Sequence, residues 1–339
     1  MHMADALLSP TVGATLWVAA FAAGGYSIRK IHIKTEENKS FIPLIGVAAS
    51  FVFAAQMINF TIPGTGSSGH IGGGLLLSIM IGPYAAFLAM TVILLIQSLF
   101  FADGGILALG ANIINMGFFS CFLAYPFIYK PLTAGHRSQA AVFGASITAA
   151  IFGLQTGAFG VVIETLLSGK TELPFTTFVL LMQPIHLAIG LVEGLITASL
   201  VLYVYKNSPE LLDHDLQKKS AKVRKIIPVL AILALLFGGL FSWFASDYPD
   251  GLEWSIEKTA GTTELVVPPG GIHGVLKSFQ QTMAFLPNYG FKHTGEIESS
   301  VHTGTTVSGL TGIILTLMGI SSVIILISFI KRRMKRRSK

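Results

Sequence analysis

Residues 72 to 101 read GGGLLLSIMIGPYAAFLAMTVILLIQSLFF, an apolar run without a single charged side chain. A helix needs about 20 apolar residues to cross the ~30 Å hydrocarbon layer of a membrane, so this run is too long for one ordinary crossing. Gly82 and Pro83 interrupt it, and a Gly-Pro pair is suited to a tight turn. We therefore expect two short crossings that meet at Gly82.

The composition of the whole chain agrees with a membrane protein. Of its 339 residues 52% are hydrophobic and 12% are charged, and the mean hydropathy is +0.68. That is about half the charged share of a soluble domain, so a water-soluble fold is excluded. We expect an all-α polytopic fold of nine helices, the two above and further spans near residues 9 to 28, 41 to 60, 111 to 129, 138 to 168, 175 to 205, 226 to 246 and 309 to 330.

Basic residues predict the orientation. Most of the 23 Lys and Arg residues lie in four clusters, at 29 to 39, 130 to 137, 206 to 225 and 331 to 339. Such clusters mark cytoplasmic loops, which also explains the formal charge of +6 without a nucleic-acid partner. Two cytoplasmic loops must be separated by an even number of crossings. Without a break, three crossings lie between Lys39 and Lys130, and splitting the long run at Gly82 makes them four. The N-terminus is then outside and the C-terminus is cytoplasmic.

The same pattern predicts the domains. We expect a seven-helix core over residues 1 to 205 and a charged cytoplasmic linker over 206 to 225. A two-helix module follows over 226 to 339, with an extracytoplasmic loop at 247 to 308 and a basic cytoplasmic tail. Two G-x-x-x-G pairs, Gly153 with Gly157 and Gly190 with Gly194, predict close packing between helices.

The first residues, MHMADALLSP, contain chelating groups. They show no positive region or cleavage site of a signal peptide, and His2 is too bulky for removal of the first Met, so we expect a free amine on Met1. This amine, the amide nitrogen of His2 and its imidazole can form two fused chelate rings. His70, in an outside glycine-rich loop, is the candidate fourth nitrogen of a square-planar site, a geometry that favours Ni(II) or Cu(II). The alternative is that His2 is incidental and His70 is interfacial.

Other polar residues lie within apolar segments. His186 and Glu193 share one helix face and either hold a ligand imidazole or form a polar pair between helices. The same alternatives apply to a further set, for which hydrogen bonds between helices are favoured: Gln97, Asp103, Asn112, Asn115 and Gln155.

The remaining histidines and the cysteine suggest less specific roles. His273, His293 and His302 fall in the extracytoplasmic loop, where solvated side chains are favoured over a weak metal-gathering site. Cys121, the one cysteine, lies in an apolar run, and we expect it to pack in the buried core rather than to bind a metal.

The sequence provides no evidence for an enzyme or for an energy source. SGKT at 168 to 171 is similar to a phosphate-binding loop, but Glu164 stands where that motif requires glycine. No G-x-S-x-G or H-E-x-x-H motif is present. Active transport would therefore draw its energy from partner subunits. A metal channel or secondary transporter acting alone is the alternative.

Several long motifs resemble the CbiM/NikM family, the substrate-binding membrane components of energy-coupling-factor nickel and cobalt transporters. They occur in order over residues 1 to 205: MHMADALLSP, PGTGSSGH with its following glycines, LLIQSLFFADGGILALGANIINMG and HLAIGLVEGLIT. The later stretch YPDGLEWSIEK resembles the small PDGLE-type companion protein, here fused to the core.

The resemblance implies a prokaryotic cell-membrane protein that captures Ni2+ or Co2+ as transported substrate. It implies seven core helices with the N-terminal segment plugged in from outside, and metal held by Met1, His2 and His70. Its partners would be a second membrane scaffold and two cytoplasmic ATPases. The chain departs from the family pattern at 3 to 6, where Met-Ala-Asp-Ala follows His2 instead of Ile-Pro-Asp-Gly.

Overall fold

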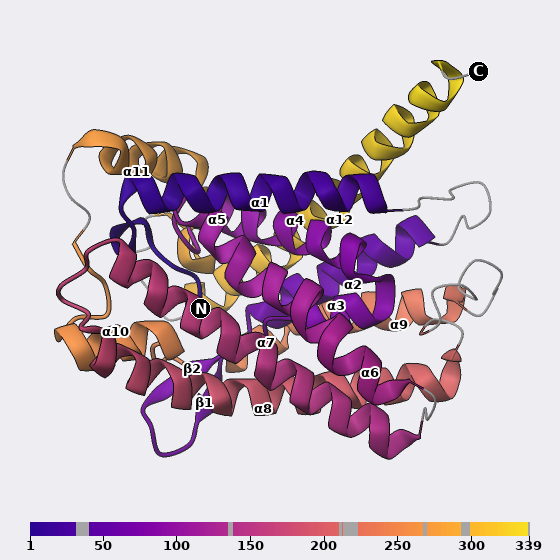
Figure 1. The fold of residues 1–339 in the computed structure, drawn as a ribbon, viewed down its shortest axis with the longest axis horizontal. Coiled ribbons are helices and arrows are strands. Elements are labelled where there is room, and N and C mark those ends of the chain that lie inside the picture. The colour runs from indigo at the N-terminus through magenta and orange to yellow at the C-terminus, as the bar shows by residue number, and fades with distance from the viewer. Residues whose placement is uncertain are drawn as a thin grey trace.

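The protein is described by a computed structural model in which helices run side by side along the long axis (Figure 1). The description covers residues 1–31, 41–134, 138–209, 212, 223–266, 270–292 and 299–337. Most of the predicted linker, at 210–211 and 213–222, and His293 lie outside the described residues. The sheet formed by these residues is a single two-stranded hairpin, so the predicted all-α class holds apart from this hairpin.

The core region contains most of the helices. Its elements are η1 (Asp5–Leu7), α1 (Pro10–Lys30), α2 (Phe41–Gln56), β1 (Phe60–Ile62), β2 (Ser67–Gly69), α3 (Gly74–Ile81), α4 (Pro83–Phe101), α5 (Leu109–Asn112), η2 (Ile113–Tyr129), α6 (Lys130–Thr133), α7 (Gln139–Leu167) and α8 (Phe175–Asn207). The later region contributes α9 (Val223–Gly239), η4 (Phe241–Phe244), α10 (Gly251–Ala260), α11 (Gly271–Met283), η5 (Pro287–Tyr289) and α12 (Ser299–Arg337).

Length and composition identify the membrane-spanning helices. Within the described residues, six segments are long and apolar enough to cross a membrane: Pro10–Lys30, Pro83–Phe101, Leu109–Thr133, Gln139–Leu167, Phe175–Asn207 and His302–Lys331. Helices α2 and α9 are apolar but shorter. Large apolar side chains are exposed on the outer surface, for example Phe21, Leu180 and Ile325, which are more than half exposed. Lipid rather than water suits such a surface.

The predicted break at Gly82 is confirmed, but the crossing before it is not a full helix. Helix α3 ends at Ile81, Gly82 takes a φ of +84°, and α4 starts at Pro83. With 8 residues α3 is about 12 Å long, well short of a membrane crossing. Residues 70 to 73, just before α3, are not helical and are buried.

Gly190 and Gly194 allow α7 and α8 to pack closely, as this G-x-x-x-G pair predicts. A Cβ on Gly190 would lie 2.9 Å from the Ile151 Cα atom, and one on Gly194 would lie 2.6 Å from the Ile147 Cα atom. Only glycine permits this approach of the two backbones. Helix α7 also lies beside the N-terminal segment, because a Cβ on Gly157 would be 3.1 Å from the Met1 Cε atom.

The later region packs directly on the core. Helices α9 and α12 both contact α2, and the Ser50 hydroxyl donates to the Ile313 carbonyl at 3.0 Å. A Cβ on Gly312 would collide with the ring of Phe53. Helices α10 and α11 lie at the end of the molecule that also holds the β-hairpin, on the left in Figure 1.

Three side chains test predictions about individual residues. Cys121 is fully buried, as predicted. His273 is also buried and its Nε2 atom bonds the Leu8 carbonyl at 2.9 Å, so the predicted solvated position is wrong for this residue. Helix α11 brings it onto the N-terminal segment, a tertiary contact that loop composition does not indicate. His302 is exposed and lies against the ring of Trp243.

Candidate metal centre

The N-terminal segment is buried inside one end of the bundle. Met1 and Met3 are buried, and Asn112 holds Met3 through both of its amide atoms. The Met3 N–H donates to Asn112 Oδ1 at 2.8 Å, and Asn112 Nδ2 donates to the Met3 carbonyl at 3.2 Å. The Asp5 carboxylate accepts from the Ala108 N–H at 3.0 Å. Asn112 therefore anchors the start of the chain, a role other than the interhelical bond that was favoured for it.

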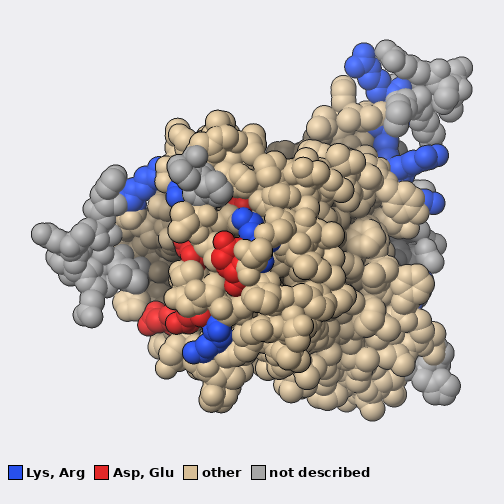
Figure 2. All heavy atoms as spheres, turned by 60° about the vertical axis from the view of Figure 1, so that its left-hand side comes forward, with Lys and Arg blue, Asp and Glu red and all other residues tan. Residues whose placement is uncertain are grey.

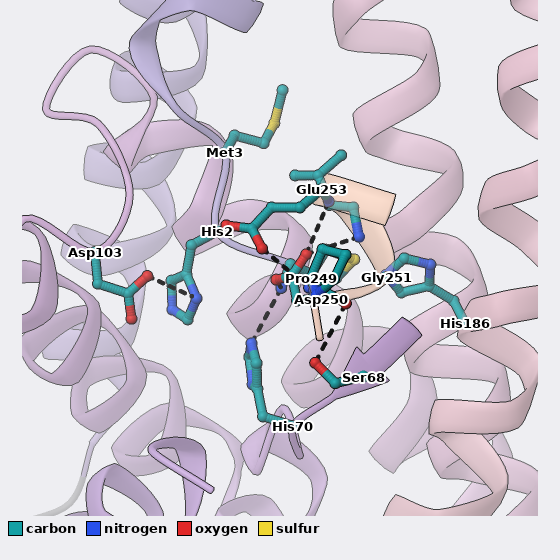
Figure 3. Close-up of polar contacts among 12 residues, drawn as sticks. His2, Met3, Ser68, His70, Asp103, His186, Pro249, Asp250, Gly251 and Glu253 are labelled. Carbon is teal, nitrogen blue, oxygen red and sulfur yellow. Dashed lines mark hydrogen bonds and ion pairs between the residues drawn. The ribbon is translucent and has the colours of Figure 1, made fainter. Parts of the chain in front are cut away.

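The Met1 nitrogen lies beside His70, as the chelate hypothesis requires. It is 3.0 Å from His70 Nε2, and both residues are buried. Ten residues around these contacts are labelled in Figure 3, with His70 pointing toward the centre of the group. The His70 Nδ1 atom lies 3.0 Å from the Ile71 carbonyl, which can accept its proton. This tautomer leaves the Nε2 lone pair free toward Met1.

Glu193 and Gln56 support the irregular backbone after His70. The Glu193 carboxylate accepts from the Gly72 and Gly73 N–H groups at 2.7 and 3.0 Å. Gln56 Nε2 donates to the Gly72 carbonyl at 2.7 Å. Non-helical backbone at membrane depth is tolerated only when its polar groups are satisfied in this way. Glu193 thus positions the loop that carries His70 and bonds neither imidazole.

For His186 the sequence left open a role in holding a ligand imidazole and a polar pair between helices. Its Nδ1 atom bonds the Met182 carbonyl one turn earlier at 2.8 Å, and its Nε2 atom has no hydrogen-bond partner among the described residues. Within the part of the chain that the structure describes, it makes no hydrogen bond with Glu193, His2 or His70. Its ring instead lies against Gly251, where an added Cβ would sit 3.1 Å from His186 Cε1.

The His2 ring is held by two side chains of the core. Gln97 Nε2 donates to Gln56 Oε1 at 3.0 Å, so Gln97 Oε1 accepts the proton of His2 Nε2 at 3.1 Å. His2 Nδ1 is the proposed chelating atom. His2 Nδ1 lies 3.3 Å from Asp103 Oδ1. Chelation would require the His2 ring to exchange this contact for the ion.

Two further predicted polar residues pair away from the N-terminal segment. Asn115 Nδ2 donates to Glu164 at 2.8 Å, and Gln155 Nε2 donates to the Gln183 carbonyl at 2.7 Å. These bonds join neighbouring helices, as the favoured interpretation predicts. Asp103 differs from them because it accepts from the Tyr289 hydroxyl at 2.5 Å, linking the core to the later region.

A residue that sequence reasoning did not single out lies closest to the Met1 nitrogen. Asp250 Oδ2 is 2.7 Å from this nitrogen, across 249 positions of sequence. Asp250 begins α10 and closes a reciprocal capping box with Glu253. The sequence contains a signal for the cap, because Asp followed three residues later by Glu is typical of a helix start. It contains none for the contact with Met1.

The segment before Asp250 pairs with the strand that leads to His70. The Ser68 N–H donates to the Pro249 carbonyl at 2.8 Å, and the Ser68 hydroxyl donates to the Tyr248 carbonyl at 2.7 Å. The Trp254 indole donates to the Thr65 carbonyl at 3.0 Å. Backbone and side-chain hydrogen bonds thus join the later region to the β-hairpin that leads to His70.

Burial and charge set the protonation of this group. Burial lowers the pKa of His2, and burial and the Met1 ammonium together lower that of His70 well below its usual value. Both rings are then neutral, the form that binds metal. Burial would raise the pKa of Asp250, but the charge and hydrogen bond of the Met1 ammonium, with the Glu253 N–H, hold it far below its usual range. Burial and neighbouring Asp250 raise the pKa of Glu253 to about 7.

A cavity of about 450 Å³ opens beside these residues and is lined by His2, His70, Asp103, Asp250, Glu253 and Tyr289, among others. Figure 2 shows acidic side chains at this end of the molecule, with a few Lys and Arg side chains beside them. Among the described residues, no group of three or more His, Cys, Asp or Glu side chains is arranged to hold a metal.

Comparison with known proteins identifies two regions. Residues 2–211 match the family model CbiM, described as the cobalt uptake substrate-specific transmembrane region, and residues 224–329 match the PDGLE domain. The chain is 31% identical over 346 residues to the fused nickel transport protein NikMN of Rhodobacter capsulatus, covering 94% of this chain and 96% of that protein.

Two further proteins match the core region. The cobalt transport protein CbiM of Sorangium cellulosum is 30% identical over 214 residues, 63% of this chain and 95% of that protein. A crystal structure of a truncated transition metal transporter superposes with a TM-score of 0.53 at 30% identity, covering 61% of this chain and 99% of that chain. The family resemblance read from the motifs is confirmed: the chain belongs to the CbiM family, a family of multi-pass membrane transport proteins and not of enzymes, and carries a PDGLE domain behind its CbiM region.

Proposed function

We propose that this chain captures Ni2+ or Co2+ for an energy-coupling-factor transporter, with four nitrogens as ligands. They are the Met1 amine, the His2 amide and imidazole, and the His70 imidazole. The observation that carries the proposal is the buried approach of the Met1 nitrogen to His70 Nε2 at 3.0 Å. The cobalt and nickel transport proteins among its relatives support the choice of substrate.

The distance between these nitrogens suits a planar complex. With metal–nitrogen bonds of about 2.0 Å, neighbouring corners of a square are about 2.8 Å apart. In the proposed chelate the Met1 amine and His70 occupy neighbouring corners, and their observed separation is 3.0 Å. The ion can therefore enter between them with little movement of either backbone.

The orientation follows from the distribution of charge. Arg29 and Lys30 end α1, and Lys206 lies in the last turn of α8. The acidic cavity lies at the end that holds the N-terminal segment (Figure 2). We place the cavity outside and the basic ends in the cytoplasm, with seven helices in the core, α1 to α8 with α3 as a short helix and α5 to α6 as one span. The two matched regions, 2–211 and 224–329, support the division into a core and a two-helix module.

Energy would come from partners. The SGKT segment lies at the end of α7, where Glu164 replaces the required glycine and its carboxylate bonds Asn115. The proposed complex therefore adds a membrane scaffold and two ATPases to this chain.

Uptake by proteoliposomes tests the proposal. Vesicles that contain this chain, the scaffold and both ATPases should accumulate Ni2+ or Co2+ only with internal ATP, and vesicles with this chain alone should not. Uptake by the chain alone would instead indicate a channel or secondary transporter. Competition between Ni2+ and Co2+ for the purified chain, whose N-terminus is first verified by intact mass, identifies the preferred ion.

A further inference from the structure

Asp250 places one carboxylate against the proposed metal ligands. Its Oδ2 atom is 2.7 Å from the Met1 nitrogen, and the two side chains are 14% and 4% exposed. The other oxygen, Oδ1, accepts from the Leu252 and Glu253 N–H groups at 2.8 and 2.9 Å. One oxygen thus fixes the carboxylate to the start of α10, and the other faces the amine.

We propose that Asp250 is the fixed counter-charge of the metal centre, supplied by the PDGLE domain to the CbiM region. This inference rests on the function proposed above. Asp250 is a positioning residue in it: the carboxylate neutralises the site without replacing any of the four nitrogens.

Charge counting supports this role in both states of the site. The empty site carries one positive charge, on the Met1 ammonium. On loading, the divalent ion binds the neutral Met1 amine, the deprotonated His2 amide and two neutral imidazoles, so the site again carries one positive charge. Two protons leave, one from the ammonium and one from the amide. A single carboxylate balances the empty and the loaded site alike, and an unbalanced buried charge would be costly in either.

The other nearby carboxylates do not bond the Met1 nitrogen. Asp5 accepts from the Ala108 N–H, and Glu193 accepts from two glycine N–H groups. Asp103 accepts from Tyr289 and lies 3.3 Å from His2 Nδ1, a contact that chelation would replace. Glu253 accepts from the Asp250 N–H at 3.0 Å as its part of the capping box. Among the described residues, Asp250 is the carboxylate that bonds the Met1 nitrogen.

The position of Asp250 is built from several independent contacts. Its segment pairs with Ser68, two residues before His70, through the Pro249 carbonyl. On the other side Gly251 packs against α8, where an added Cβ would lie 3.0 Å from Ile189 and 3.1 Å from His186. Glycine at this position allows α10 to approach closely enough for the carboxylate to reach the amine.

The test compares variants of the full-length chain in detergent, titrated with Ni2+ and with Co2+. Asp250→Asn and Asp250→Ser both retain a capping side chain but remove the charge. We expect each to weaken metal affinity about 10- to 100-fold. Asp250→Glu, which keeps the charge, should bind more tightly than either. Glu253→Gln is the matched control, since it can keep the capping box without contacting Met1, and its affinity should stay near that of the wild type.

The visible absorption of bound Ni(II) separates a counter-charge from a ligand. At saturation the Asp250→Asn spectrum should equal that of the wild type, because the four nitrogens are unchanged. Wild-type affinity in both neutral variants would overturn the proposal, and so would an altered spectrum, which would make Asp250 a ligand. Failure of the proposed function looks different: the wild-type chain would then bind neither ion, or His70→Ala would bind as well as the wild type.

Discussion

Asn112 bonds the backbone of Met3 through both ends of its side-chain amide, so the two residues pair as neighbouring strands do. The side-chain amide of Asn112 uses both its donor and its acceptor, and the two residues are 109 positions apart in the sequence. This pairing fixes the register of the N-terminal segment. The Met1 amine and His2 are placed relative to His70 through it.

Asn112→Leu should weaken metal binding without unfolding the bundle. The change leaves the Met3 N–H buried without a partner, at a cost of about 1 to 3 kcal/mol, which corresponds to roughly 5- to 150-fold in affinity. Calorimetric titration with Ni2+ measures it. Gln155→Leu removes a bond between α7 and α8 far from the N-terminal segment and serves as the control. Equal losses in the two variants would contradict a specific role for Asn112.

His70→Ala should abolish high-affinity binding while the protein stays folded, because one of four proposed nitrogens is removed. His302→Ala, at an exposed histidine against Trp243, removes a ring of the same kind and should bind normally. Metal content after size-exclusion chromatography and a thermal melt together measure the effect. Unchanged metal content in the His70 variant would refute the site.

Glu193→Ala should weaken binding more than His186→Ala does. The first change frees two buried glycine N–H groups beside His70, and the second removes a ring that bonds only the Met182 carbonyl among the described residues. We expect a difference of about tenfold or more in affinity. Glu193→Gln keeps one acceptor oxygen and should be intermediate. A larger loss in the His186 variant would favour the ligand-holding role, one of the two alternatives that the sequence left open for this residue.

A one-residue extension before Met1 should destroy binding although every side chain remains. The extension converts the amine to an amide and moves the histidine out of the second position of the chain. A tag after Lys339 adds residues at the other end and is the control. Equal metal content in the two tagged proteins would exclude the Met1 amine as a ligand.

Cysteine labelling measures the orientation. Cys121, the single native cysteine, is buried and should give little background. Lys258→Cys, near the end of α10, should react with an impermeant maleimide in intact cells. Lys206→Cys, in the last turn of α8, should react only after permeabilisation. The reverse pattern would invert the proposed topology.

The sequence predicted the helices well, because apolar runs and basic clusters are local properties. It also predicted the break at Gly82, since a Gly-Pro pair acts through its own backbone. It did not predict that α3 is so short. The irregular backbone before α3 depends on Glu193 and Gln56, which reach it from distant helices.

The candidate site could be proposed from the sequence only where its groups are neighbours along the chain. The amine of Met1 and His2 adjoin each other, and the fused chelate rings led from them to His70 as a partner. Asp250 was missed because its capping role is local but its contact with Met1 depends on how two regions dock. Asn112 was visible as a buried amide, without any sign that its partner is the backbone of Met3.

The attachment of the PDGLE domain to the CbiM region on one chain has a kinetic consequence. A tethered segment meets its site at an effective concentration in the millimolar range, however dilute the protein is. The strand-like docking of residues 248 to 250 on Ser68 would therefore re-form after each opening at a rate independent of expression level. In a relative whose PDGLE domain is a separate chain, the domain would dissociate on dilution. In this protein each CbiM region keeps one PDGLE domain attached.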